Sequence, residues 1–226
     1  MATPEQPLRS HAIEDYAKAI YVLETRAREA VSTTALAERL SVTPGSASAM
    51  IKKLDEHGLV SHTPYRGVRL TAQGRRTALE VIRHHRLLEL FLAEVLEMPW
   101  DRVHQEAEVL EHVLSSELEE IIAAKLGNPT RDPHGDPIPT PDFQIDEGET
   151  CSLADLHPGD CGVFVRVSDA DPEMLRYLGA RGVTPGASLE VVERQPFGGP
   201  LFVRFGPDVH PLGGDLAHAM RVEMSA

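Results

Sequence analysis

The stretch from Val103 to Ile121, VHQEAEVLEHVLSSELEEI, concentrates side chains that bind metal ions. Read as one helix, it places four such side chains at positions i, i+4, i+7 and i+8, which lie on one face. These side chains are His104, Glu108, Glu111 and His112. The preceding helix, predicted over Thr77 to Leu96, carries His85 and Glu89 one turn apart. The spacing predicts a metal cleft between two helices, although a solvated acidic face with incidental histidines fits the same pattern.

Charge is distributed unevenly along the chain. The formal net charge is −13 at pH 7, but residues 1–75 contain 10 Lys/Arg against 8 Asp/Glu. The remaining residues contain 12 Lys/Arg against 27 Asp/Glu. Only the N-terminal part is therefore electrostatically suited to meet nucleic-acid phosphates. A cation bound in the acidic part would offset some of its self-repulsion.

The size and composition indicate a soluble globular protein. At 226 residues, the chain has room for two or three small domains with their own cores. We expect a cytoplasmic protein that does not enter a membrane, because a run of about 18 apolar residues and an apolar signal-peptide core are both missing. Cys151 and Cys161 do not form a close metal pair, and they fit a reducing compartment better than a disulfide framework.

The first 75 residues predict a winged helix-turn-helix. Residues 9–28 follow a helical period, with Glu14 and Asp15 in the first turns, where acids also complement the helix dipole. A short helix at 35–40 precedes a second helix that Thr43-Pro44 begins and Gly58 stops. Two strand-like runs then flank a Pro-Tyr-Arg-Gly tip. A helix-turn-helix followed by such a hairpin is a more specific sign of a winged helix than either part alone. The alternative is an ordinary αβ core element whose arginine is exposed to solvent.

The second helix of the pair has the composition of a recognition helix. Small and polar side chains at its start can approach base edges, and lysines further along can meet phosphates. The hairpin tip adds a basic and an aromatic side chain. The predicted DNA-binding residues are Thr43, Pro44, Ser46, Ser48, Ala49, Lys52, Lys53, Tyr65 and Arg66.

The long helix supplies more apolar surface than one face needs to pack its own domain. This excess indicates either a helical dimer interface or a large intradomain core. The residues concerned are Leu87, Leu88, Leu90, Phe91, Leu92, Val95 and Leu96.

The composition changes after the helical region. Residues 127–150 contain five prolines and no helical period, which indicates a linker or domain boundary. Beyond them, short strands and one short helix predict a small all-β barrel. The strands are expected at 163–167, 188–193, 201–205 and 218–223, and the helix at 173–178.

These residues resemble the diphtheria-toxin-repressor family of metal-dependent transcriptional regulators, over essentially the whole chain. The resemblance is carried by Glu108-Val-Leu-Glu111-His112, His85-Arg-Leu-Leu-Glu89, Glu14-Asp15-Tyr16 and HGDPIP at 134–139. The wing sequence TPYRGVRLTAQG is similar to that of the manganese-responsive branch. The resemblance implies a mainly α fold with small β parts. Its expected divisions are a winged helix-turn-helix over 1–75, a helical dimerisation domain over 76–140, a linker over 141–150 and a C-terminal SH3-like β-barrel over 151–226.

The resemblance also implies two separate metal sites. The primary site would use Asp15, Glu108, Glu111 and His112. The ancillary site would use His85, Glu89 and His104, completed by ligands of the SH3-like domain near Asp171 and Glu173. The resemblance implies that iron-sensing members carry a methionine and a cysteine at the positions of Asp15 and Glu108. In this chain both residues are carboxylates. Hard oxygen donors suit Mn²⁺, while Fe²⁺, Co²⁺, Zn²⁺ or Cd²⁺ can still bind in vitro.

Lys18 is a departure from the pattern. The two-domain manganese regulators carry a glutamate at this position, so their closely spaced dinuclear site is not expected here. Histidines outside the two sets, among them His11 and His134, are predicted to be packing or surface groups.

The resemblance implies that metal acts as a corepressor. Without metal, repulsion among the acidic groups would leave the first helix loosely docked. Metal would clamp Asp15, and with it the winged helix, against the dimerisation domain. In a homodimer this would set two recognition helices about 34 Å apart, on successive major grooves of a palindromic double-stranded DNA operator. The regulated genes would be metal uptake genes.

The predicted function is therefore a Mn²⁺-dependent transcriptional repressor without enzyme activity. An Fe²⁺-responsive repressor of iron uptake genes has the same architecture and differs only in its effector. A metallohydrolase would use the carboxylate and histidine site to activate water, but it needs an open coordination position and a general base. A metal-buffering or structural protein, with the winged helix as a protein-interaction module, is the third alternative.

Overall fold

The computed structural model describes residues 11–63 and 66–225, which divide between two compact units. The first unit contains the chain up to His84, together with Glu111–Leu114 and Pro139–Gln144. The second unit contains His85–Leu110, Ser115–Ile138 and the chain from Ile145 onward. These divisions cut through the region expected to form the helical domain, so the three-domain division stays a prediction.

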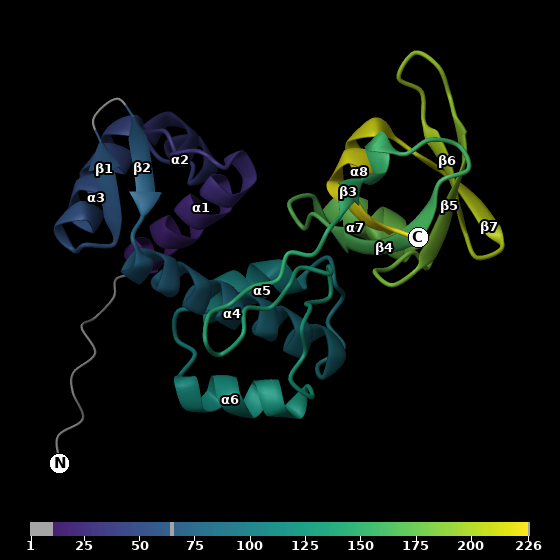
Figure 1. Cartoon of the computed structure of the whole chain (residues 1–226). Helices are drawn as coiled ribbons and strands as arrows, with labels where there is room; N and C mark the ends of the chain where they lie inside the picture. Colours follow the sequence, from purple (N-terminus) through teal and green to yellow (C-terminus); the bar gives the residue numbers. More distant parts are fainter. Residues whose placement is uncertain (1–10, 64–65, 226) are drawn as a thin grey trace. The chain divides into compact units, whose positions relative to one another are not determined.

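The first unit contains a winged helix-turn-helix, in which three helices pack beside a two-stranded hairpin (Figure 1). Its elements are α1 (His11–Ala27), α2 (Thr33–Arg39), α3 (Pro44–Glu56), β1 (Val60–Thr63) and β2 (Gly67–Leu70). Hydroxyl groups cap both short helices. Ser32 accepts a hydrogen bond from the backbone N of Ala35 at 3.1 Å, and Thr43 accepts one from Ser46 at 3.1 Å. The predicted winged helix is confirmed.

The wing is fixed to the helices by backbone contacts. Val31 bridges to Val68, and β1 and β2 pair antiparallel. Gly67 has a φ of +93°, and a Cβ atom there would lie 2.7 Å from the carbonyl oxygen of Val31, so a glycine is required. Apolar side chains from the helices and the wing form the core of this unit, including Ile13, Tyr16, Ile20, Leu36, Ile51, Leu54 and Val68.

The metal-rich stretch is not the single helix that its period predicted. It forms α5 (Val103–Leu110) and α6 (Ser116–Lys125), and Glu111 and His112 lie in the turn between them. Ser115 explains the break, because its hydroxyl accepts a hydrogen bond from Leu118 N at 3.2 Å and caps a new helix. The preceding helix α4 (Ala72–Glu94) begins earlier than expected, after Thr71 caps it through the backbone N of Gly74.

The apolar residues of α4 are mostly internal to this chain. Leu87, Leu88, Leu90 and Leu92 are buried, whereas Val95 and Leu96, which follow the end of α4, are exposed. The alternative of a large intradomain core is therefore confirmed for the four buried leucines.

The C-terminal part of the second unit is a six-stranded antiparallel sheet in the order β3-β8-β4-β5-β6-β7. Its elements are β3 (Cys151–Ser152), η1 (Leu153–Asp155), β4 (Cys161–Val167), α7 (Pro172–Gly179), β5 (Ser188–Arg194), β6 (Leu201–Phe205), β7 (Asp208–Leu212), α8 (Gly214–Ala219) and β8 (Met220–Met224). The sheet is consistent with an SH3-like domain, but it is not closed, since β3 and β7 form its edges. The expectation of a closed barrel is corrected accordingly.

Sequence patterns did not predict β3 and β7, and they placed the start of β8 too early. The strand β7 contains Pro211, and proline is tolerated there because β7 lies at the edge. The strand expected from His218 begins only at Met220, because α8 occupies the preceding residues. Buried apolar side chains fill the core beside the sheet, including Phe164, Leu178, Val191, Val203, Leu212, Met220 and Val222.

The proline-rich stretch after α6 is only partly a linker. Asp132, His134 and Ile138 are buried, so the part before Pro139 is packed rather than exposed. Residues 141–150 form neither helix nor strand. Among the described helices, none combines the length and apolar composition that crossing a membrane requires, and a cytoplasmic location stays a prediction.

Candidate metal centres and DNA-binding surface

His112 lies among carboxylates in the first unit, and we call this group the primary centre. Its Nε2 atom is 2.9 Å from Oδ1 of Asp15 and 3.5 Å from Oε1 of Glu111. Its Nδ1 atom is 2.7 Å from Oε2 of Glu14. The ligand atoms of Asp15, Glu111 and His112 all lie within 4.8 Å of one another. One ring nitrogen thus faces two potential ligands while a carboxylate holds the other, which is how metal-binding histidines are commonly oriented.

Lys18 and His11 complete the surroundings of the primary centre. The Lys18 ammonium donates to both carboxylate oxygens of Glu111, at 2.7 and 2.9 Å. The Glu111 side chain is 0% exposed, so this ion pair is screened little by solvent. The ring of His11 stacks on His112 with 4.7 Å between centroids. Sequence reasoning placed neither His11 nor Glu14 in the site, although Glu14 adjoins Asp15 in the motif that carried the resemblance.

Glu108 belongs to the second unit, unlike the other three residues predicted for the primary site. Its Oε1 atom lies 3.8 Å from Nδ1 of His85 and 3.7 Å from Nε2 of His104. Its role in the primary centre therefore stays a prediction.

A second group of potential ligands, the ancillary cluster, lies within the second unit. Oε1 of Glu89 is 3.0 Å from Nε2 of His85 and 3.2 Å from Nδ1 of His104. Oδ2 of Asp169 is 2.9 Å from the same nitrogen of His104. Ligand atoms of His85, Glu89, His104 and Asp169 lie within 4.8 Å of one another. The structure therefore brings together the three predicted helical residues and adds Asp169.

The structure does not bring Asp171 and Glu173 to this cluster. The Asp171 carboxylate caps α7 by accepting a hydrogen bond from the backbone N of Glu173 at 2.9 Å. The Glu173 side chain is 86% exposed and lies 3.7 Å from Arg176. Asp169, which lies two residues before Asp171 and precedes α7, is the residue of this segment that approaches His104.

Burial and hydrogen bonds shift the pKa values of the groups in the ancillary cluster. Hydrogen bonds to Asp169 and Glu89 raise the pKa of His104 to about 10. Burial alone would raise the pKa of Glu89, but the charge of His85 and hydrogen bonds from His104 outweigh it and hold that pKa well below its usual value. Burial likewise raises the pKa of Asp169, yet the hydrogen bond from His104 brings it below normal. A metal bound through His104 would have to replace the proton on its ring.

His134 and Asp132 extend the cluster from the segment after α6. His134 donates from Nε2 to the carbonyl oxygen of Trp100 at 2.8 Å, because a carbonyl can only accept. Its Nδ1 atom lies 3.7 Å from Oε2 of Glu89, too far for a hydrogen bond, and is buried without a partner among the described residues. Ligand atoms of Glu89, Asp132 and His134 also lie within 4.8 Å of one another. The two oxygens of Glu89 thus face different histidines.

Sequence reasoning did not place this segment beside Glu89. The sequence predicts a packing or surface role for His134 and a linker or domain boundary for the residues around it. The available signal was HGDPIP, which carried part of the family resemblance without an assigned role. A loop has no period that relates it to a distant helix, so spacing could not place His134 beside Glu89.

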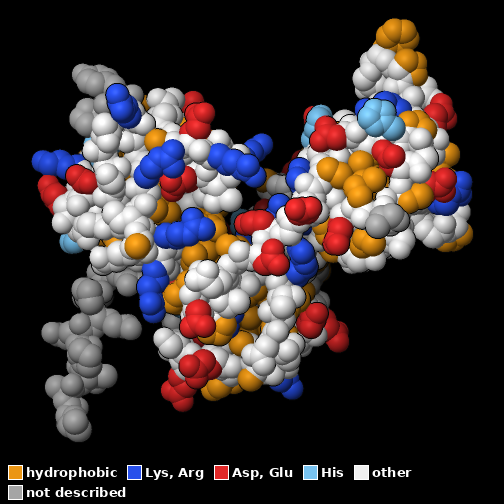
Figure 2. Space-filling model, in the orientation of Figure 1, with side chains coloured by type: hydrophobic (Ala, Val, Ile, Leu, Met, Phe, Trp, Pro, Cys, Tyr) orange, Lys and Arg blue, Asp and Glu red, His pale blue; other side chains and the backbone are white. Residues whose placement is uncertain are grey.

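The residues predicted to contact DNA are exposed wherever the structure describes them. Thr43, Pro44, Ser46, Ser48, Ala49, Lys52, Lys53 and Arg66 are all exposed, and Tyr65 lies outside the described residues. Figure 2 shows Lys and Arg side chains over the winged helix-turn-helix on the face in view. Thr43 is also the helix cap, and Lys52 lies 3.8 Å from Glu56, so Lys53 and Arg66 are the stronger candidates for phosphate contacts.

A winged helix-turn-helix combined with carboxylate and histidine clusters defines a metal-dependent DNA-binding regulator. Comparison with known families bears this out along the chain. Residues 10–68 match "Iron dependent repressor, N-terminal DNA binding domain". Residues 71–140 match "Iron dependent repressor, metal binding and dimerisation domain", and residues 151–224 match "FeoA domain".

Full-length relatives agree with these matches. The iron-dependent repressor IdeR of Mycobacterium tuberculosis is 33% identical over 93% of this chain and 96% of its own length. The diphtheria toxin repressor of Corynebacterium efficiens is 31% identical over 93% of this chain and 94% of its own. The protein belongs to the iron-dependent repressor family, which includes the diphtheria toxin repressor. The members of this family are metal-dependent transcriptional repressors.

A solved structure points to a different metal from the names of these relatives. A manganese-dependent transcriptional repressor in complex with manganese is 44% identical and superimposes with a TM-score of 0.85. The match covers 94% of this chain and 100% of that protein. The resemblance inferred from the sequence is thus confirmed, with both iron- and manganese-dependent proteins among the relatives.

Proposed function

We propose that this protein is a Mn²⁺-responsive repressor of metal uptake genes that acts as a homodimer. The observation that carries the proposal is the position of His112 between Glu14 and Asp15 of α1, 98 positions away from Glu14 in the chain. The helix that supplies these carboxylates belongs to the same unit as the recognition helix α3. A change at this centre therefore acts directly on the DNA-binding unit.

The residues of the primary centre fit a divalent cation. Asp15, Glu111 and His112 offer two oxygens and one nitrogen, and Lys18 already neutralises part of the Glu111 charge. A bound divalent cation supplies the remaining positive charge that lets the acidic groups converge. Because Glu111 and His112 follow α5 directly, holding α1 to them also ties the winged helix-turn-helix to the helical region by chain continuity.

Manganese is the proposed effector because the primary donors are hard. Carboxylate oxygens and one imidazole suit Mn²⁺, whereas thiolate or thioether ligands would favour softer or later metals. Neither of the two cysteines, Cys151 and Cys161, belongs to the metal-binding groups among the described residues. The manganese-dependent repressor is 44% identical to this chain, against 33% for the iron-dependent repressor IdeR, which also favours Mn²⁺.

For the ancillary centre we propose ligands drawn from His85, Glu89, His104 and Asp169, with Asp132 and His134 on the inner side of Glu89. The convergence of these groups supports this set, as does the buried Nδ1 atom of His134, which makes no hydrogen bond among the described residues. Asp169 takes the place that the sequence had given to Asp171 and Glu173.

A homodimer would cover exposed apolar side chains on the helical region. Val109 is 71% exposed, Leu118 47% and Ile121 57%, and all three belong to the second unit. The family match that includes them is described as a dimerisation domain. Two such surfaces in contact would remove apolar area from water and would set the separation of two recognition helices on a palindromic operator.

The proposal is tested by DNA-binding titrations with promoter DNA from metal-transporter genes. Wild-type protein is titrated with Mn²⁺, Zn²⁺ and anaerobic Fe²⁺, with a chelator as the blank. Binding that requires metal and is supported by Mn²⁺ at lower concentration than Fe²⁺ supports the proposal. Equal binding in chelator contradicts it, and stronger activation by Fe²⁺ favours the iron-responsive alternative.

Two variants of α5 make the test specific to the site. Glu108→Ala removes the proposed primary ligand whose assignment comes only from the sequence resemblance. Glu106→Ala is the control, because it removes an exposed carboxylate from the same helix. We expect metal-dependent DNA binding to fail with Glu108→Ala and to survive in Glu106→Ala. Equal behaviour of the two variants would remove Glu108 from the primary centre.

A further inference from the structure

The segment from Thr130 to Gln144, which we call the strap, joins the ancillary cluster to the DNA-binding unit. Its first part, through Ile138, belongs to the second unit and carries Asp132 and His134. Its second part, Pro139–Gln144, belongs to the first unit. One short piece of chain therefore has potential metal ligands near one end and contacts within the DNA-binding unit at the other.

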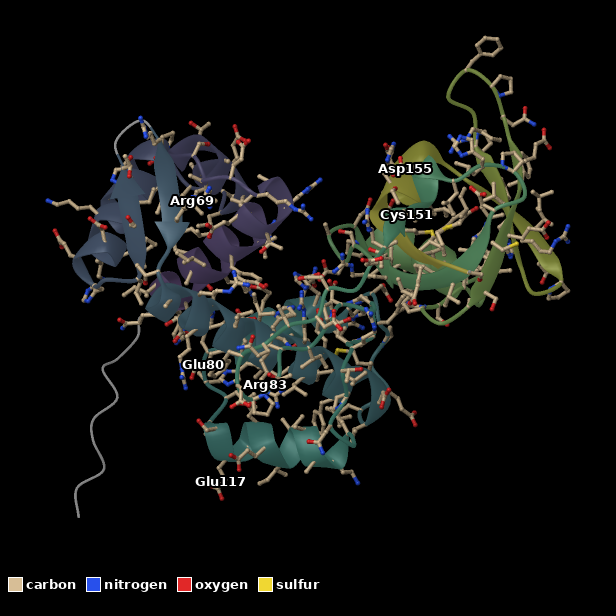
Figure 3. The ribbon with its side chains drawn as sticks, viewed as in Figure 1. Arg69, Glu80, Arg83, Glu117, Cys151 and Asp155 are labelled. Atoms are coloured by element: carbon tan, nitrogen blue, oxygen red, sulfur yellow. The ribbon has the colours of Figure 1, made fainter. Side chains whose placement is uncertain are left out.

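Three arginines of α4 hold the strap along its length. Arg86 donates to the carbonyl oxygen of Pro137 and lies 3.5 Å from Oδ1 of Asp136. Arg83, labelled in Figure 3, is buried and donates to the carbonyl oxygen of Pro139 at 2.6 Å. Arg76 lies 4.8 Å from the ring centroid of Phe143. The spacing of the three arginines, seven and then three positions, places them on one face of the helix.

The ligand end of the strap has little freedom to move. Oδ1 of Asp132 accepts hydrogen bonds from the backbone N of His134 and of Asp136, both at 2.9 Å. Val167 of β4 donates to the carbonyl oxygen of His134 at 2.9 Å. Gly135 has a φ of +89°, and a Cβ atom there would lie 1.8 Å from a backbone oxygen, so the chain passes β4 without spare space. Any displacement of His134 or Asp132 on ligation would therefore displace this backbone as well.

The middle of the strap is stiff. Pro137, Pro139 and Pro141 alternate with other residues, and each fixes its own φ and restricts the residue before it. Proline-rich segments behave as semi-rigid spacers of about 3 Å per residue, unlike flexible glycine-serine linkers. A spacer of this kind transmits a displacement from one end to the other.

The far end of the strap is a tight turn held in a strained conformation. Phe143 donates from its backbone N to Thr140 O at 2.8 Å, and Gln144 donates to the Thr140 hydroxyl at 3.1 Å. Phe143 has a φ of +58°, a left-handed conformation that is unfavourable for an aromatic residue. Such strain persists only where the surroundings hold it, and here Arg76 lies over the ring.

We infer that the strap conveys the occupancy of the ancillary centre to the DNA-binding unit, with Arg76, Arg83 and Phe143 as positioning residues. The inference rests on the proposed function, because it requires metal at the ancillary centre. Ligation through Asp132 or His134 fixes the first part of the strap, and the proline run then fixes where Pro139–Gln144 meets the first half of α4. The ancillary metal thereby supports DNA binding without touching the primary ligands.

The test measures amide hydrogen exchange of Thr140 and residues 142–144 in the full chain, with and without Mn²⁺, beside DNA affinity and Mn²⁺ stoichiometry. Phe143→Asn removes the ring but tolerates the left-handed backbone, and Phe143→Tyr restores a ring. Asp142→Ala, at an exposed position of the same segment, is the control. We expect Mn²⁺ to slow exchange in wild type. Phe143→Asn should lose this effect and about tenfold in metal-dependent DNA affinity with unchanged Mn²⁺ stoichiometry, as expected for a coupling between sites.

Each outcome decides the matter. Rescue by Phe143→Tyr and wild-type behaviour of Asp142→Ala support the strap. The strap proposal is overturned if Mn²⁺ does not change the exchange rates in wild type, or if Phe143→Asn keeps full DNA affinity. Either result leaves the Mn²⁺-dependent DNA binding of wild type intact. Loss of Mn²⁺-dependent binding in wild type itself would overturn the proposed function and the strap together. If Phe143→Asn fails to fold, Arg76→Gln tests the same contact from the exposed side of α4, with Arg76→Lys as the variant that keeps the charge.

Discussion

Oε2 of Glu14 lies 2.7 Å from Nδ1 of His112, on the opposite side of the ring from Asp15. Glu14 therefore orients the ring and makes its other nitrogen available as a ligand. We expect Glu14→Ala to weaken Mn²⁺ binding at the primary centre by about 10- to 100-fold, the usual cost of losing a partner that orients a metal ligand. Competition with a chelator of known affinity measures the effect.

The control for Glu14 is Glu29→Ala, which removes an exposed carboxylate after the end of α1. If both variants lose the same affinity, general loss of negative charge is the cause and the orienting role of Glu14 is wrong.

Lys18 should set how many ions the primary centre holds. Its ammonium lies 2.7 and 2.9 Å from the Glu111 oxygens, so a positive charge of the protein already occupies the place beside this carboxylate. We expect wild type to bind two Mn²⁺ per chain, one in each centre, and Lys18→Glu to bind a third. Equilibrium dialysis with elemental analysis counts the ions. Lys18→Arg, which keeps the charge, should retain the wild-type count, and a third ion in that variant would show that charge is not the determinant.

The parts of the site that could be predicted are those encoded by local spacing. His85 and Glu89 are one turn apart on a long helix, and Glu111 and His112 are adjacent, so even the broken helix leaves the last two together. The caps at Ser32 and Thr43 likewise fixed the helix-turn-helix, because hydroxyl capping is a local interaction.

The parts that could not be predicted depend on contacts between distant segments. His134 reaches Glu89 from a loop, and Asp169 reaches His104 from the residues before α7. The helical period continued through Ser115, and only the cap that it forms shows that a new helix starts there. Periodicity reports which face a residue occupies but does not report where a helix is interrupted.

Metal binding at the ancillary centre should release protons and strengthen as the pH rises. The pKa of His104 is raised from 6.5 to about 10 by Asp169 and Glu89, so its ring is protonated at pH 7 without metal. This stabilisation of the metal-free fold is fully present below pH 6.5 and is lost as the pH rises through about 10. Because a ligating imidazole nitrogen must be unprotonated, each displaced proton should raise the apparent Mn²⁺ affinity about tenfold per pH unit between these limits.

Calorimetry in buffers with different ionisation enthalpies counts the protons released. The variant His104→Gln should release fewer protons than wild type and show a shallower pH dependence. A pH-independent affinity in wild type would mean that the histidines keep their protons and do not ligate.

His134→Gln tests whether His134 is a ligand. The glutamine amide can still donate to the Trp100 carbonyl from the position of Nε2, but it lacks a donor atom at the position of Nδ1. We expect Mn²⁺ affinity at the ancillary centre to fall at least about tenfold while the primary centre is unchanged. His157→Gln, at a histidine whose side chain is 80% exposed, is the control. An unchanged two-site titration would limit His134 to packing against Trp100.

The DNA-binding surface predicts two kinds of mutational effect. Lys53 is exposed on α3 and should contact a phosphate, so Lys53→Ala should weaken binding to every sequence and reduce the slope of log affinity against log salt by about 1. Ser48 is exposed nearer the start of the same helix, where base edges are read, so Ser48→Ala should alter the preference among operator sequences and leave the salt slope unchanged. Fluorescence anisotropy over a salt series measures both, with Lys125→Ala on α6 as a matched loss of one exposed lysine. If Lys125→Ala changes the slope as much as Lys53→Ala, the effect belongs to net charge, and α3 loses its assignment as the recognition helix.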